Sequence, residues 1–251
     1  METAGGRYHR AFIAILLGLL FSLAAPAQEL MPDMEPYLRT TLVPATYDIN
    51  TIELTNLYNF SLVAASWSYT CDGSARRRGS GDAALVFTDA VAQGSKFPGI
   101  SADNVCTGTI TAAIFADGKE LGDPAVLRRM HNCRKASWEE LHRTLKEDIL
   151  AGPTYNWDVD STLNKLRARR AQFPTYIYVD HVDPEHEDDR GCRMDILDYL
   201  IFNVKEYQSD IAQEPSKYPE RGMKFLRYLV GWEKALTSST YPPAHWWKLD
   251  W

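Results

Sequence analysis

The sequence predicts an α+β protein in which a small antiparallel, immunoglobulin-like β-sandwich precedes an all-helical second half. Residues 45–118 are rich in Thr, Tyr, Val and Ile and are interrupted by Gly, Asn, Asp and Ser, which is typical of short strands joined by turns. After Gly118 the apolar residues recur at the spacing of amphipathic helices. We therefore place the sandwich at residues 45–118 and the helical region at residues 119–240.

The N-terminal segment, residues 1–27, has the three parts of a secretory signal peptide. Arg7 and Arg10 form a positive start, residues 11–25 are small and apolar, and Ala25-Pro26-Ala27 is a cleavage site of the A-x-A type. The apolar run is shorter than the roughly 20 residues of a spanning helix, which favours cleavage before Gln28 over an uncleaved anchor. We expect a secreted protein, periplasmic or extracellular, with no membrane span after cleavage.

The charge balance argues against nucleic acid as a partner. The chain has 27 basic and 33 acidic residues and a formal net charge of −6, so it repels phosphate backbones. Two basic runs do not change this expectation. Residues 76–78 lie among Gly and Ser and are predicted to be a solvated loop, and residues 165–170 are predicted to be the solvated face of a helix.

The chain has four cysteines, Cys71, Cys106, Cys133 and Cys192, and none forms a C-x-x-C motif. An even number in an exported chain predicts two disulfides, for which three pairings are possible. The long spacings argue against a zinc cluster or a thioredoxin-like pair. Because two cysteines lie in each half, we favour the disulfides Cys71–Cys106 and Cys133–Cys192.

The expected elements follow from local patterns. An extended leader at residues 28–44 precedes the predicted strands at 46–54, 60–69, 83–87 and 105–115, and the last of these is apolar or small on both faces, as in a strand covered on two sides. Asp123-Pro124 is an N-cap followed by Pro at the first helical position, and Gly152-Pro153 ends the pattern. One long helix at 124–151 and two shorter helices fit equally well. Further helices are predicted at 160–172, 190–207 and 217–236.

The junction between the two halves resembles one found in uncharacterised exported bacterial proteins. It comprises residues 110–118 (ITAAIFADG) followed by Gly122-Asp123-Pro124. In those proteins an AVIFADG…GDP signature closes an N-terminal sandwich and opens a helical region; Ala113 stands here where the signature has Val. The resemblance covers residues 45–135 and implies this architecture and a bacterial cell-envelope setting. It implies no activity and no site residues.

One acidic and histidine-rich segment, residues 180–189, could hold a metal ion. His181, Asp183 and His186 would be the ligands of a divalent cation, as part of a metal-dependent or hydrolytic enzyme that uses residues 181–189. The spacing matches neither H-E-x-x-H nor an EF-hand loop. Residues 185–189 also fit the acidic first turn of a helix, which the helix dipole stabilises. We favour this structural interpretation and expect no cofactor.

Motifs for other chemistry are absent from the sequence. It contains no G-x-S-x-G, P-loop or G-x-G-x-x-G motif, and His131 and His142 are predicted to be surface or packing residues of the long helix. The hypothesis is therefore a non-enzymatic interaction or structural module of the cell envelope. The C-terminal residues 241–251 hold three of the seven Trp. We favour packing of these rings onto the helical half; the alternative is binding of a glycan or of an envelope protein.

Overall fold

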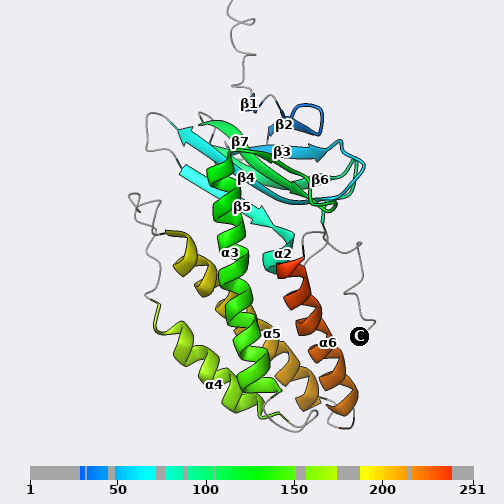
Figure 1. Ribbon diagram of the computed structural model, residues 1–251, viewed down its shortest axis with the longest axis vertical. Helices are drawn as coiled ribbons and strands as arrows, with labels where there is room; N and C mark the ends of the chain where they lie inside the picture. The colour runs from blue at the N-terminus through cyan, green and yellow to red at the C-terminus, as the bar shows by residue number, and fades with distance from the viewer. Residues whose placement is uncertain are drawn as a thin grey trace, which may run out of the picture.

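The computed structural model describes residues 29–31, 33–44, 49–71, 77–86, 90–103, 106–150, 157–173, 187–213, 216 and 218–238. Two small sheets form the first half and helices form the second, with the sheets stacked at one end of the helices (Figure 1). The predicted α+β architecture is confirmed at this level, and the immunoglobulin-like topology remains a prediction. The predicted signal peptide and Trp-rich tail lie outside the described residues.

The larger sheet has the strand order β1-β7-β4-β5, with β8 also paired to β7, and the smaller sheet has the order β2-β3-β6. All described pairs are antiparallel except the short pair of β1 with β7. The strands are β1 (Glu29–Leu30), β2 (Leu38–Pro44), β3 (Ile49–Asn56), β4 (Leu62–Cys71), β5 (Arg77–Asp82), β6 (Lys96–Asp103), β7 (Cys106–Phe115) and β8 (Glu120–Gly122).

Three predicted strands correspond to β3, β4 and β7, and the strand predicted at residues 83–87 is wrong. Ala83–Val86 is a short helix, α2, because Asp82 caps it: the backbone N–H of Ala84 donates to Oδ1 of Asp82 at 2.9 Å. The loop predicted at residues 76–78 is also wrong, since β5 begins at Arg77. Strand β2 lies within the predicted leader, and β6 and β8 were not predicted.

The two central strands, β4 and β7, are covered on both faces, as the sequence of β7 predicts. On one face Ile110 and Phe115 pack in a core with Leu38 and Leu54 of the smaller sheet. On the other face the small and apolar side chains of β4 and β7 pack against the first long helix; this cluster comprises Ala64, Ala112, Ile114, Val126 and Met130. The larger sheet is therefore a middle layer between the smaller sheet and the helices.

The helices are α3 (Pro124–Arg143), which continues into the π-helix η1 (Thr144–Ile149), α4 (Val159–Arg170), α5 (Glu187–Gln213) and α6 (Tyr218–Thr237). Of the two alternatives for the first segment, the single long helical run is the one observed. Asp123 caps it as predicted, since its carboxylate accepts a hydrogen bond from the N–H of Ala125 at 2.7 Å. A large core, which includes Leu141, Leu200 and Trp232, joins these helices. No described helix combines the length and the apolar character that crossing a bilayer requires.

Gly122 fixes the junction between β8 and α3 because no side chain fits there. Its φ is +104°, and a Cβ atom would lie 2.3 Å from the carbonyl oxygen of Thr111. We expect Gly122→Ala to lower the free energy of unfolding by at least about 1–3 kcal/mol, measured by denaturant unfolding. Gly191→Ala is the matched control, since it has open space within α5 and should not destabilise the protein. Equal midpoints for the two variants would contradict this explanation.

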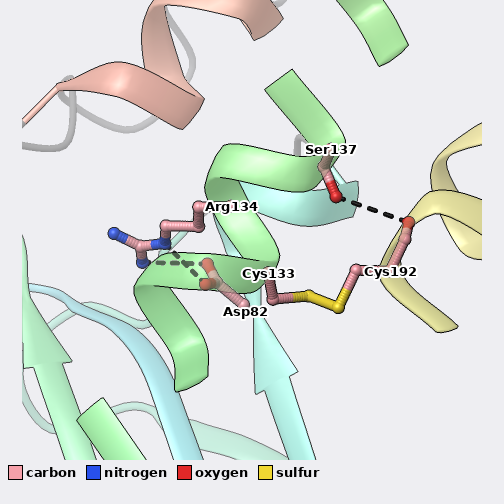
Figure 2. Close-up of a disulfide and its surroundings, with 5 residues drawn as sticks. All are labelled: Asp82, Cys133, Arg134, Ser137 and Cys192. Atoms are coloured by element: carbon pink, nitrogen blue, oxygen red, sulfur yellow. Dashed lines mark hydrogen bonds and ion pairs between the residues drawn. A yellow bond between two sulfur atoms is a disulfide. The ribbon is translucent and has the colours of Figure 1, made fainter. Parts of the chain in front are cut away.

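A disulfide joins α3 to α5. The sulfur atoms of Cys133 and Cys192 are 2.00 Å apart, and the two residues are 59 apart in sequence (Figure 2). This is the pairing that the sequence analysis favours. In the sheet, the register of β4 and β7 sets the backbone of Cys71 opposite that of Cys106. Opposed Cα atoms in an antiparallel ladder are about 4.5–5.5 Å apart, which a disulfide can span, so the register is compatible with the second pair. That second disulfide remains a prediction.

Loss of the α3–α5 disulfide is expected to destabilise the fold. Replacing Cys133 and Cys192 together with Ala should lower the free energy of unfolding by about 2–4 kcal/mol, because the bond restricts the unfolded chain over a long loop. Denaturant unfolding of the oxidised protein and of the double variant measures this difference. A midpoint that is the same in both proteins, with the wild-type bond verified by mass spectrometry, would contradict the expectation.

Candidate functional site

A pocket of about 400 Å³ lies where the larger sheet meets α3 and the end of α6. Its volume is within the range of small-molecule sites, about 300–1,000 Å³. Two stretches far apart in sequence contribute to it: the consecutive elements β7, β8 and α3, and the C-terminal end of α6. The lining residues are Ile114, Gly118, Glu120, His131, Arg134, Lys135, Trp138, Leu236, Thr237 and Ser238.

One face of α3 supplies most of the polar groups. His131, Arg134, Lys135 and Trp138 are three, four and seven positions apart, so their side chains lie on the same side of the helix. The neighbouring face carries Met130, which packs on the larger sheet and fixes the rotation of the helix. The same packing that holds α3 against the sheet therefore directs this polar face into the pocket.

Arg134 is the most constrained of these groups. It is only 7% exposed, and Asp82 at the end of β5 is 9% exposed. Nε of Arg134 donates to Oδ2 of Asp82 at 2.6 Å and Nη2 donates to Oδ1 at 3.0 Å, so the carboxylate is held by two parallel bonds. Figure 2 shows the third nitrogen, Nη1, pointing away from Asp82. Nη1 has no hydrogen-bond partner among the described residues, so both of its N–H donors remain unused.

Three more polar groups of the pocket are solvent-exposed, namely Lys135, His131 and Glu120. Lys135 follows Arg134 on α3 and makes no ion pair with any described residue. Nε2 of His131 and Oε1 of Glu120 are 2.6 Å apart, and the two side chains are 46% and 36% exposed. This contact joins α3 to β8 at the edge of the pocket.

Trp138 gives the pocket an aromatic side chain, and a contact with His142 fixes the orientation of its ring. Its ring stacks on that of His142, with the centroids 4.8 Å apart and the planes inclined by 25°. Nδ1 of His142 is in turn paired with the Glu233 carboxylate of α6. Ile114 and Leu236, both almost fully buried, supply the remaining apolar lining. A ring or an aliphatic chain can therefore be placed beside groups that hold a charge.

No family model matches the chain, and no curated protein or solved structure matches it. The resemblance of the strand-to-helix junction to exported bacterial proteins therefore remains an expectation. The pocket itself is the basis for a functional hypothesis.

The predicted metal ligands, His181, Asp183 and His186, lie outside the described residues, so the metal hypothesis remains a prediction. Among the residues that the structure describes, no group of three or more His, Cys, Asp or Glu side chains could hold a metal ion. Helix α5 begins at Glu187, and residues 187–189 thus form the acidic first turn of a helix. This position agrees with the structural interpretation of these acidic residues.

Removal of divalent cations is expected to leave stability unchanged. If residues 185–189 only begin a helix, EDTA or added zinc should not shift the melting temperature of the full chain. A bound metal would stabilise the native state by mass action, so a zinc-dependent rise that is lost in the variant His181→Ala/His186→Ala would contradict this expectation.

The pocket residues were not predicted as a site, because each histidine taken alone carries no functional signal. His131 is exposed and His142 stacks on Trp138, which agrees with the prediction of surface or packing residues, and both lie on the helix face that carries Arg134, Lys135 and Trp138. The pattern H-x-x-R-K-x-x-W-x-x-x-H at helical spacing is the signal that could have drawn attention to this face. Its partners could not be found this way, since Asp82 is 52 positions from Arg134.

A second polar cluster comprises Tyr37, Tyr58, Asp117 and Lys119, whose side chains contact one another. Nζ of Lys119 lies 3.9 Å from the ring centroid of Tyr37 and 5.3 Å from that of Tyr58. Its hydrogen bond to the Tyr37 hydroxyl raises the pKa of Lys119, and the hydrogen bond between the Tyr58 hydroxyl and Asp117 raises the pKa of Tyr58. The Tyr37 and Tyr58 rings thus bind the ammonium group of Lys119 from the same chain. We therefore interpret this cluster as a structural feature and not as a ligand site.

Proposed function

We propose that the protein is exported and acts as a non-enzymatic binding protein whose pocket between α3 and α6 takes a small organic acid. The observation that carries this proposal is the guanidinium of Arg134. Asp82 holds it rigidly, and its Nη1 donors remain without a partner among the described residues, on a side chain that lines the pocket.

A guanidinium fixed in this way is well suited to a carboxylate. Its position is set before the ligand arrives, so little conformational entropy is lost on binding. Hydrogen bonds between charged groups are stronger than those between neutral groups, and Arg presents its donors in a planar arrangement that matches a carboxylate. Lys135, next in sequence, adds a second positive charge. Trp138 provides the apolar surface that such sites combine with a few polar groups.

Export is supported by the N-terminal pattern of the sequence and by the disulfide between Cys133 and Cys192. Disulfides persist in oxidising compartments and are rare in the cytosol. A periplasmic or extracellular location is therefore part of the proposal, as is an envelope-derived or external source of the ligand. Fractionation of cells that produce the full chain, followed by N-terminal sequencing, tests the location and the predicted start at Gln28.

Ligand binding is tested by calorimetry with hydrocinnamate and with hydrocinnamyl alcohol, which has the same ring and chain length but no charge. We expect hydrocinnamate to bind more tightly than the alcohol by about tenfold or more. The affinity for hydrocinnamate should fall as salt is added, because salt screens the charges. Lys135→Gln should lower the affinity for hydrocinnamate and leave the affinity for hydrocinnamyl alcohol unchanged. Lys146→Gln, an exposed lysine in η1 outside the pocket, is the matched control. Equal affinities for acid and alcohol would overturn the proposed function.

A further inference from the structure

The pocket is lined by groups of opposite charge. Arg134 and Lys135 of α3 are positive. Glu120 of β8 is negative, and the C-terminal end of α6 also reaches the pocket, where Leu236, Thr237 and Ser238 line it. A helix carries a partial negative charge at its C-terminal end, equivalent to roughly half an elementary charge. A ligand with a single negative charge would match only the positive groups.

The Glu120 carboxylate can still accept hydrogen bonds from a ligand. One of its carboxylate oxygens, Oε1, is paired with His131, and the other, Oε2, has no partner among the described residues. The side chain is 36% exposed, so a small molecule in the pocket can reach it. Its placement on β8 is rigid because β8 pairs with β7 and ends at the constrained Gly122.

We propose that the ligand of this pocket is a zwitterion, namely an α-amino acid with an apolar side chain. Nη1 of Arg134 and Nζ of Lys135 bind its carboxylate, and Glu120 together with the end of α6 binds its ammonium group. Ile114, Trp138 and Leu236 surround the side chain. This inference rests on the proposed function and adds the ammonium subsite and the apolar character of the ligand.

The charges that line the pocket explain why a zwitterion fits better than a simple acid. A bound carboxylate is attracted by Arg134 and Lys135, and it is repelled by Glu120, which lines the same pocket. The positive charge of Arg134 is also partly compensated by Asp82 behind it. An ammonium group on the ligand turns the repulsion from Glu120 into an attraction, since opposite charges at contact distance favour each other.

Three ligands that share a phenylethyl skeleton and differ in their charged groups separate the two subsites. Phenylalanine carries both charges, hydrocinnamate lacks the ammonium group, and phenethylamine lacks the carboxylate. Calorimetry on the full chain is expected to show phenylalanine binding more tightly than either partial ligand by about tenfold. Hydrocinnamate affinity equal to or greater than that of phenylalanine would overturn the zwitterion inference while leaving the proposed organic-acid function in place. Absence of binding by all three would overturn both.

The variant Glu120→Gln assigns the ammonium subsite. Gln keeps the shape of Glu120 and can still contact His131, so the fold is expected to persist; an unchanged melting temperature verifies this. In the variant, the advantage of phenylalanine over hydrocinnamate should disappear, and hydrocinnamate should bind as well as before or better because a repulsion is removed. Glu147→Gln, an exposed carboxylate in η1, is the matched control and should change neither affinity. A retained advantage of phenylalanine in Glu120→Gln would overturn the assignment.

Discussion

Replacing Asp82 with Ala is expected to lower the free energy of unfolding by about 3–5 kcal/mol, because the variant leaves the guanidinium of Arg134 buried without its counter-charge. Both side chains are almost fully enclosed, with 8% of the Arg134 side chain and 3% of the Asp82 side chain exposed. Asp82 also caps α2, so a smaller loss from the missing cap adds to the effect. Denaturant unfolding of the two proteins measures the difference.

An exposed ion pair provides the control for this result. Arg170 and Asp198 are also in contact, at 2.8 Å, but the Asp198 side chain is 54% exposed. Asp198→Ala should therefore change the free energy of unfolding by less than about 1 kcal/mol. A similar loss in both variants would show that burial of the Arg134–Asp82 pair does not determine its contribution.

A double variant separates the buried charge from the cap. In Asp82→Ser/Arg134→Met the hydroxyl of Ser can still cap α2, and the unpaired charge is gone. Replacing a buried ion pair with residues that leave no charge is often neutral or stabilising, so most of the stability lost in Asp82→Ala should return. A double variant as unstable as Asp82→Ala would mean that the pair is needed for more than charge compensation.

The helices could be predicted from the sequence because their signals are local. Asp123 marks the start of α3 by capping it, and Pro124 does so by its fixed φ. Both effects involve only residues 123–125. The apolar spacing then indicates the buried side of each helix, as Leu197, Leu200 and Val204 show in α5. Such features do not depend on how the rest of the chain folds.

The elements that the sequence did not predict depend on distant partners. Residues 83–86 are a short apolar run without a helical period, yet the Asp82 cap starts a helix there, and α2 in turn packs on α6 through Ala84. Strand β5 is polar and rich in Gly, and it exists because its backbone pairs with β4. The pocket depends on such contacts throughout, since its walls come from β8, α3 and the end of α6. Local patterns could identify a polar face on α3 but not what lies across from it.

The contact that places α6 at this pocket leads to the second large expected effect. Trp232 is fully buried, and its Nε1 donates a hydrogen bond to the carbonyl oxygen of Ala84 in α2 at 2.9 Å. Trp232→Ala is expected to lower the free energy of unfolding by about 3–5 kcal/mol, because the substitution leaves a large cavity in the helical core. Thermal and denaturant unfolding measure this loss.

Two further substitutions separate the hydrogen bond of Trp232 from its buried volume and provide an exposed control. Trp232→Phe keeps most of the apolar volume and leaves the Ala84 carbonyl unpaired, so it should cost about 1–3 kcal/mol. Phe202→Ala removes an aromatic ring that is 60% exposed on α5 and should change stability by less than about 0.5 kcal/mol. If Trp232→Ala lowered the free energy of unfolding as little as Phe202→Ala, the enclosed core around Trp232 could not be what joins α6 to α2.

Because Leu236 lies one helical turn beyond Trp232 and lines the pocket, Trp232→Phe should also weaken hydrocinnamate binding, even where the protein remains folded.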